Sequence, residues 1–320
     1  MEKESIFSGF VTRHAQSAKH DTPDEVYKSL TPKGVEQAKE RANSDILRLI
    51  EEAPDGAVMF IGGGSDQPRS EETAEIYGGE INHLVNYELK DKLNIQVVTR
   101  DFIKWAIDPG EASAEEKQKN LELMLQRIEE MIKENPGKKF VVDYPMRLWG
   151  FSYGYRSRDE NGKLDGEPRW LDPETGKASK FFATIIKEKG NNEGGQAYIA
   201  GNGEYIDQSG KTLHGPKPQD IARQYFNGLE KLSKFAARHT DRPLILGGVG
   251  HAWDVDSLAT WLSLGCPEVE VDSDKFNERF LEISQGGEIS NESEMVSFEI
   301  EPEQIKVRYR GKEFSSSLIR

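Results

Sequence analysis

The chain has 320 residues, of which 31% are charged and 36% are hydrophobic, and its formal net charge at pH 7 is -14. An excess of negative charge this large repels phosphate backbones and anionic lipid headgroups, so we expect neither nucleic acid nor a membrane as a partner. The single cysteine, Cys266, excludes an internal disulfide, and the lack of any apolar run of roughly 20 residues predicts a cytoplasmic protein without a membrane span.

The first part of the chain consists of a short apolar run followed by a longer amphipathic segment. Residues 6–12 are apolar and rich in β-formers, which predicts a strand. After a polar loop, residues 31–53 place apolar side chains at helical spacing. Thr31 is positioned to cap this helix, and Pro32 suits its first turn. The chain is therefore expected to open with a strand and a helix.

The same pattern repeats directly afterwards. Residues 57–61 predict a buried strand, and the glycine-rich loop after it leads into a helix at 67–77. Gly78 and Gly79 are expected to end this helix, because glycine is disfavoured in a helix interior. A third strand is expected near residues 83–89.

The middle of the chain is less regular. An amphipathic helix is predicted at about 114–133 and a strand at 138–145. From residue 146 to about 218 the helical periodicity fails, and Gly, Asp, Asn and Lys alternate with aromatic residues. Such a long stretch without periodicity is uncommon inside a compact domain, so we expect a lid-like insertion at about 110–215.

Regular structure returns toward the C-terminus. A helix is predicted at 218–239, an apolar strand at 243–251 and a further helix at 254–265. Residues 296–310 alternate apolar and polar side chains around Pro302, which predicts an antiparallel hairpin at the edge of a sheet.

Together these elements predict the fold class and the domain organisation. Strands that alternate with helices favour a mostly parallel sheet covered by helices on both faces. We therefore expect an α/β fold: a three-layer α/β/α sandwich with a mostly parallel central sheet, a large lid-like insertion and a C-terminal β-hairpin. Residues 1–320 are expected to form a single domain.

Polar residues that could take part in binding or catalysis follow three of the predicted strands. In an open parallel sheet, ligands bind outside the carboxyl ends of the strands, so residues at these ends can converge. The residues are Arg13 and His14 after the first strand, Ser65 and Arg69 after the second, and His251 at the end of the strand 243–251. If these strands are neighbours, two arginines and two histidines meet in one pocket beside helix N-termini, which favour an anion.

This set of side chains suits a phosphoryl group. Guanidinium groups bind phosphoryl oxygens bidentately, and a neutral imidazole can attack phosphorus and carry the group covalently. The cationic side chains then do the work of a metal ion, so we expect no metal and no cofactor. His251, Asp254 and Asp256 could in principle ligate a divalent ion, but acidic residues favour a helix start without any metal. We expect a small phosphorylated substrate as the partner.

At these positions the sequence resembles the histidine phosphatase superfamily, also called phosphoglycerate mutase-like. The family's first signature is matched by Arg13-His14-Ala15-Gln16, and a conserved stretch that follows it is matched by residues 30–38. The second signature is matched by Ser65, Arg69, Glu72, Thr73 and Ala74. The third, a strand that ends in histidine before a helix, is matched by His251. The resemblance covers residues 5–95 and 215–265.

The resemblance implies a role for each matched residue. His14 is the expected nucleophile that becomes phosphorylated, and Arg13 and Arg69 are the expected phosphate clamp. His251 is expected to stabilise the group in transfer. Members of the family also supply a carboxylic acid that protonates the leaving group, in the region after the second arginine.

The sequence leaves the identity of this proton donor open. Asp91 is the choice that we favour, with Glu88, Asp101 and Asp108 as alternatives. The donor needs a raised pKa in a partly desolvated pocket, and no sequence pattern shows which carboxyl group has one.

Three functions remain compatible with these residues. The first, which we expect, is a metal-independent phosphomonoesterase that acts on a small phosphorylated metabolite, forms a phosphohistidine and then transfers the group to water. The second is a mutase, which returns the group to its product under a lid that excludes water. The third is an inactive module that binds phosphate or a phosphopeptide without turnover. Neither the natural substrate nor the oligomeric state follows from the sequence.

Overall fold

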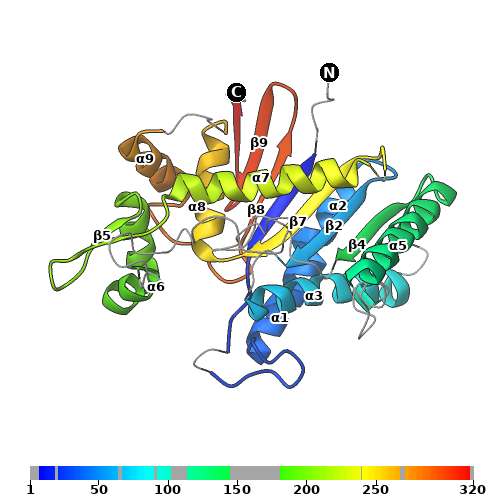
Figure 1. Cartoon of the computed structure of the whole chain (residues 1–320), viewed down its shortest axis with the longest axis horizontal. Helices are drawn as coiled ribbons and strands as arrows, with labels where there is room; N and C mark the ends of the chain where they lie inside the picture. The colour runs from blue at the N-terminus through cyan, green and yellow to red at the C-terminus, as the bar shows by residue number, and fades with distance from the viewer. Residues whose placement is uncertain are drawn as a thin grey trace.

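The central feature of the protein is an eight-stranded sheet (Figure 1). The structure is a computed structural model, and it describes residues 7–18, 21–63, 67–89, 92–101, 114–144, 181–238, 240–266 and 271–317. The strands of the sheet are β1 (Ser8–Arg13), β2 (Val58–Gly63), β3 (Ile95–Val98), β4 (Lys139–Tyr144), β7 (Leu244–Gly250), β8 (Met295–Ile300), β9 (Gln304–Tyr309) and β10 (Lys312–Ser317).

The order of the strands is β10-β9-β8-β1-β7-β2-β4-β3. The five strands from β1 to β3 in this order pair in parallel, whereas β8 pairs with β1 in the antiparallel direction. The predicted mostly parallel sheet is therefore confirmed. Its parallel part places the carboxyl ends of β1, β7 and β2 side by side at one edge.

Helices cover both faces of this sheet, so the three-layer prediction is also confirmed. One face carries α1 (Pro32–Arg41), the π-helix η1 (Ala42–Ile46), α2 (Leu47–Glu52), α3 (Pro68–His83) and the π-helix η2 (Leu84–Glu88). The other face carries α5 (Ala114–Glu134), α6 (Phe181–Ala200), α7 (Pro218–Ala236), α8 (Ala252–Ser263) and α9 (Ser273–Ile283). In Figure 1, α7 runs across the strands of the sheet.

The core is divided in two by the sheet, because successive residues of a strand point to opposite faces. In β2, Val58 and Phe60 pack into the core under α7 and α8, while Met59 and Ile61 pack under α1 and α3. All seven residues of β7 are buried. A strand buried on both faces appears in sequence as a continuous apolar run, which is how residues 243–251 could be predicted.

Thr31 caps α1 as the sequence predicts. Its side-chain oxygen accepts a hydrogen bond from the Gly34 backbone N–H at 2.9 Å. The Thr31 hydroxyl in turn donates to Oε1 of Gln16 at 2.8 Å. The cap therefore fixes the start of α1 and also anchors the loop that follows β1.

The prediction that Gly78 and Gly79 end a helix is wrong. Helix α3 runs through both glycines to His83 and continues into η2, so the strand expected near 83–89 is helical instead. A Cβ atom at Gly78 would lie 2.4 Å from the carboxyl group of Asp143. Glycine therefore serves here to let α3 approach β4 closely, a packing requirement that the sequence does not reveal.

The close approach at Gly78 brings a buried ion pair against α3. Nη2 of Arg100 donates to Asp143 at 3.0 Å, and Nη1 donates to Glu75 of α3 at 3.0 Å. Arg100 and Asp143 are 3% and 4% exposed. Burial is the main reason that the pKa of Asp143 is raised to about 6, against the opposing charge of Arg100. The pair ties the end of β3 to β4 and α3.

Part of the range predicted as an insertion, about 110–215, belongs to the central sheet. Strand β4 lies between β2 and β3 and pairs in parallel with both. The described remainder of the range contains α6 and a two-stranded hairpin, β5 (Glu204–Ile206) with β6 (Thr212–His214). Residues 145–180 lie outside the described residues, so the lid stays a prediction.

The C-terminal hairpin predicted at 296–310 is confirmed as β8 and β9, which pair in the antiparallel direction. A further strand, β10, extends it at the sheet edge. Arg310 and Gly311 connect β9 to β10, with φ angles of 51° and 69°. Positive φ at both positions is typical of a tight hairpin turn, and Gly311 adopts it without strain. Strand β10 carries few apolar residues, which is why its sequence gives no strand signal.

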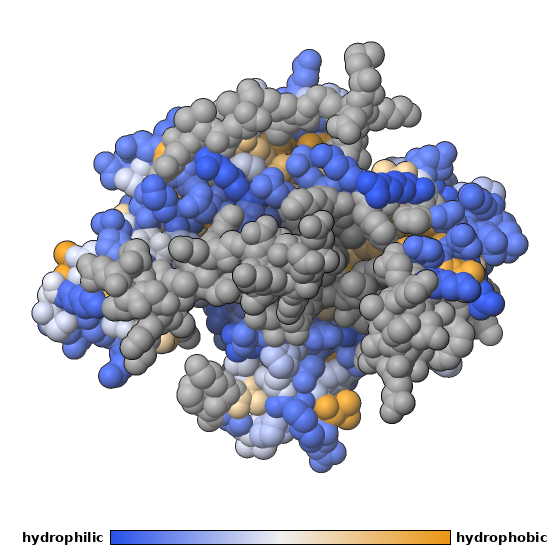
Figure 2. Space-filling model, viewed as in Figure 1, coloured by the Kyte–Doolittle hydropathy of each residue, from blue (hydrophilic) through white to orange (hydrophobic). Residues whose placement is uncertain are grey.

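Among the coloured residues on the face that Figure 2 shows, hydrophilic ones dominate and apolar ones appear as isolated spots. The large hydrophobic side chains that are exposed among the described residues are Val26, Tyr87, Leu123, Ile186, Ile206 and Leu281. They lie on different elements. Within the described part of the chain, every helix is too short or too polar to cross a bilayer.

The glycine pair in α3 gives a matched test of this packing. We expect Gly78→Ala to destabilise the fold by about 1–3 kcal/mol, because its Cβ would collide with the buried Asp143 carboxyl group. Gly79→Ala meets nothing within 4 Å, so we expect it to be neutral or to stabilise by up to about 1 kcal/mol through helix propensity. Urea unfolding of both variants measures the difference, and equal free energies of unfolding would contradict the close-approach explanation.

Candidate active site

The parallel pairing of β1 with β7 brings the two predicted histidines together. Arg13 is the register partner of Gly250, and the His14 backbone N–H donates to the Gly250 carbonyl at 2.9 Å. His14 and His251 therefore follow neighbouring strands at the same carboxyl edge. Their ring centroids lie 5.1 Å apart with an interplanar angle of 73°.

His14 is held in one orientation by contacts to both ring nitrogens. Its Nδ1 lies 2.7 Å from the Ala15 carbonyl oxygen, so this nitrogen carries the proton and donates. Its Nε2 accepts a hydrogen bond from Nε of Arg69 at 3.0 Å. The lone pair of the neutral ring is therefore on Nε2, the nitrogen that faces Arg69.

Arg69 is positioned by the first turns of α3. Thr73, one turn further on, donates from its hydroxyl to the Arg69 carbonyl at 2.7 Å and accepts from the Ala15 N–H at 3.2 Å. Thr73 thus links the helix to the residue after His14. Arg69 also reaches the second histidine, with Nη2 3.5 Å from Nδ1 of His251. One guanidinium therefore contacts both rings.

His251 is fixed at the start of α8 through its backbone. Its N–H donates to Oδ2 of Asp254 at 2.7 Å, and Tyr225 of α7 donates its hydroxyl to the same oxygen at 2.7 Å. Because an arginine can only donate, the contact of Arg69 with Nδ1 leaves the proton of a neutral His251 on Nε2.

Both histidines are neutral over the ordinary pH range. Burial, and then the charges of Arg69 and Arg13, lower the pKa of His14 to about 3. Burial is also the main reason that the pKa of His251 is well below its usual value, with further contributions from His14, Arg69 and Arg13. A buried imidazole among guanidinium groups keeps its lone pair, because protonation would add a positive charge in a desolvated site.

Arg13 lies near His14, Arg69 and His251, and these four residues are called the cluster below. The side chain of Arg13 reaches toward the segment before β8. Its Nη1 donates to the Ser290 carbonyl, and its Nη2 contacts Oε1 of Glu292 at 3.3 Å. Its Nε is buried and has no partner among the described residues. Sequence reasoning missed Ser290 and Glu292, because no local pattern marks a contact across 279 positions of the chain.

The acidic residues after His251 are bound by protein groups. Asp254 accepts from His251 and Tyr225, as described above. Asp256 is fully buried and accepts from the Tyr309 hydroxyl at 2.5 Å and from the Ser290 N–H at 3.1 Å. Among the described residues, no group of three or more His, Cys, Asp or Glu side chains is arranged to hold a metal ion.

Of the four predicted proton donors, Asp91 and Asp108 lie outside the described residues, as does Ser65 of the second motif. Glu88 is in η2, and roughly 28 Å of helix separates it from Arg69 at the carboxyl edge of the sheet. Its carboxylate lies 3.3 Å from Nε2 of His83. The structure therefore contradicts Glu88 as the donor.

Asp101 follows β3, at the same edge of the sheet as His14, and its side chain is exposed. However, β3 is four strands away from β1 in the sheet, a distance of about 19 Å at the usual strand spacing. Two described carboxylates do contact the cluster: Asp254, through the backbone N–H of His251, and Glu292, through the side chain of Arg13.

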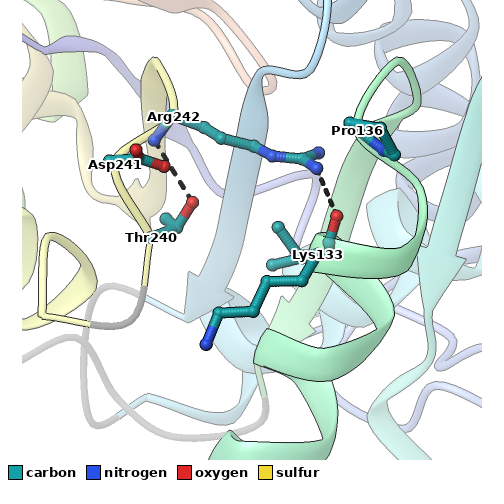
Figure 3. A pocket seen from close by; sticks show the side chains of 6 residues that line it. Lys133, Pro136, Thr240, Asp241 and Arg242 are labelled. Atoms are coloured by element: carbon teal, nitrogen blue, oxygen red, sulfur yellow. Dashed lines mark hydrogen bonds between the residues drawn. The ribbon is translucent and has the colours of Figure 1, made fainter.

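A cavity of about 270 Å³ lies at the opposite edge of the sheet, next to the start of β7 (Figure 3). Arg242 extends along it, and its guanidinium donates to backbone carbonyls that include those of Lys138 and Asn135 at 3.1 and 3.2 Å. These contacts cap the end of α5, and the charged guanidinium of Arg242 is thereby bound by groups of the protein itself. The four-residue cluster at the carboxyl edge remains the candidate active site.

No protein-family model matches the sequence, and no curated protein matches it. Solved structures align with it at low similarity. The native mycobacterial glucosyl-3-phosphoglycerate phosphatase aligns over 91% of this chain and 89% of its own, with 12% sequence identity and a TM-score of 0.35. A putative alpha-ribazole-5'-P phosphatase from Escherichia coli aligns over 98% of each chain, also with 12% identity and a TM-score of 0.35.

A third structure, that of mycobacterial hydrolase 2, aligns over 98% of this chain and 89% of its own, with 12% identity and a TM-score of 0.34. The two phosphatases are members of the histidine phosphatase superfamily. At this level of similarity the alignments do not bear on what this chain does.

Proposed function

We propose that this protein is a metal-independent phosphomonoesterase in which His14 forms a phosphohistidine. The observation that supports this most directly is the state of the His14 ring. Its Nδ1 is held by the Ala15 carbonyl at 2.7 Å, and its Nε2 accepts from Arg69 at 3.0 Å. A nitrogen with a fixed lone pair beside a guanidinium is suited to attack a phosphorus atom whose oxygens that guanidinium binds.

In the first step, a phosphomonoester enters the cluster and Arg69 moves its hydrogen bond from His14 to a phosphoryl oxygen. The Nε2 lone pair then forms a bond to phosphorus while the bond to the ester oxygen breaks. The leaving oxygen takes a proton from a carboxylic acid or from water. In the second step, water attacks phosphorus and gives a proton to the carboxylate or solvent that supplied one in the first step. The P–N bond breaks, its electron pair returns to Nε2, and His14 is neutral again as phosphate leaves.

His251 is the proposed partner that stabilises the transferring group. Its ring lies 5.1 Å from that of His14, and its Nδ1 lies 3.5 Å from Arg69. With the proton on Nε2, the ring can donate to a phosphoryl oxygen as negative charge builds. The phosphoryl oxygens are then surrounded by hydrogen-bond donors from Arg69, Arg13 and His251. With these donors in place, the transfer does not require a metal ion.

Two other functions use the same residues. A mutase would return the phosphoryl group to a second hydroxyl of the substrate, and a binding module would hold phosphate without turnover. The contact of Arg69 with His14 favours neither of them over hydrolysis. An assay with an added alcohol separates a phosphatase from a transferase. A phosphatase transfers the phosphoryl group to water, whereas a transferase transfers it to the alcohol.

A direct test uses 4-nitrophenyl phosphate in the presence of EDTA. We expect the wild-type protein to release phosphate and His14→Ala to lose about a thousandfold or more in kcat, because the attacking nitrogen is gone. His83→Ala is the matched control, since His83 is exposed on α3 and has no contact with the cluster. Activity that EDTA abolishes, or that survives in His14→Ala, would contradict the proposal.

The pKa of His14 gives a second test, which needs no substrate. We expect NMR titration to show the His14 ring neutral from pH 7.5 down to pH 5, because its pKa is lowered to about 3. In Arg69→Ala the pKa should rise, since a neighbouring positive charge and a donor to Nε2 are removed. A wild-type His14 that titrates near 6.5 would contradict a buried nucleophile with a fixed lone pair.

A further inference from the structure

The contact between Arg13 and Glu292 places a carboxylate on a guanidinium that the proposed function assigns to phosphate. The guanidinium of arginine presents Nε and Nη2 along one edge, and this edge can bind two oxygens at once. Glu292 occupies only Nη2, at 3.3 Å, and Nε is buried without a partner among the described residues. On this edge of the Arg13 guanidinium, one of the two donors is therefore bound by a carboxylate of the same chain.

The backbone around Glu292 is anchored on both sides. Before it, Ser290 is fully buried and donates its N–H to Asp256 at 3.1 Å, while its carbonyl accepts from Nη1 of Arg13. After it, the Glu294 carboxylate accepts from Nε of Arg310 at 2.9 Å, and the Glu294 carbonyl accepts from the Arg13 N–H at 2.9 Å. The segment 290–294 is therefore held in place independently of the Glu292 side chain.

The Glu292 side chain itself is held more weakly. It is 34% exposed, and its ion pair with Arg13 is its one contact given by the described residues. A single partly exposed ion pair of this kind contributes little stability and is readily exchanged. The side chain can turn into solvent while Ser290 continues to hold Arg13 in position.

We propose that Glu292 is an internal competitor for the phosphate clamp, which gives up Arg13 when a phosphoryl group binds and takes it back when inorganic phosphate leaves. This inference rests on the proposed function. A phosphoryl group carries close to two negative charges at neutral pH and three acceptor oxygens, so it can fill both Nε and Nη2 and displace a carboxylate that fills one. When the phosphoryl group is bound, both Nε and Nη2 of Arg13 have an acceptor.

The competition has a defined kinetic consequence. Every anion that needs Arg13, whether substrate or product, must first displace Glu292, so the affinity of both falls by a common factor. A uniform loss of binding raises KM and weakens product inhibition without changing the barrier of the chemical step. Glu292 thereby protects turnover from the phosphate that the reaction releases, because the return of the carboxylate assists release.

The test compares Glu292→Gln with a matched control from the same loop, which connects α9 to β8. Glutamine keeps the size of the side chain and removes its charge. Glu288→Gln removes the same charge from an exposed residue whose carboxylate lies 4.0 Å from Arg310 instead of Arg13. Thermal unfolding of each variant establishes that it folds. Calorimetric titration with inorganic phosphate measures affinity, and steady-state assays with 4-nitrophenyl phosphate measure KM and the phosphate inhibition constant.

We expect Glu292→Gln to bind phosphate roughly threefold to tenfold more tightly than wild type, with KM and the inhibition constant lowered by the same factor. Glu288→Gln should match wild type. If wild type binds phosphate and Glu292→Gln binds it equally or more weakly, the competitor role is overturned while the proposed function stands. If neither protein binds phosphate, both the proposed function and the competitor role fail.

Discussion

The parallel pairing of β1 with β7 is the constraint on which the candidate site depends. It places Arg13 opposite Gly250, so that the chain leaves both strands at the same level and His14 lies next to His251. Strand β2, on the other side of β7, leads into α3 and delivers Arg69 to the same edge. Residues that are far apart in sequence converge because three neighbouring strands point in one direction.

The electrostatics of the molecule divide into two opposing groups. Between about pH 3 and 6.5, the unfolded chain protonates His14 and the folded chain does not, so the folded state loses stability as the pH falls through this window. Asp143 and Asp256, whose pKa values burial raises to about 6, act in the opposite sense between about pH 6 and 3.8. In mildly acidic solution the buried His14 and the two buried carboxyl groups therefore change the stability of the fold in opposite directions.

The sequence predicted what depends on local pattern. Periodicity located β7 and α7, Thr31 marked the start of α1, and residues such as Arg69 and His251 could be assigned to strand ends and helix starts. It could not predict contacts that need the whole fold. The role of Gly78 depends on Asp143 of another strand, and the partner of Arg13 lies near the far end of the chain. The proton donor could not be identified either, because exposure and distance to His14 are tertiary properties, and they remove Glu88.

The attachment of Arg13 to the segment before β8 couples the first strand of the chain to its last ones. The guanidinium needs the Ser290 carbonyl, and the backbone N–H needs the carbonyl of Glu294. The docking of β8 against β1 therefore has to bring residue 13 and residues 290–294 together before this guanidinium is oriented. A change that frees the segment 290–294 from Asp256 would therefore loosen Arg13 without altering any of the four residues at the carboxyl edge.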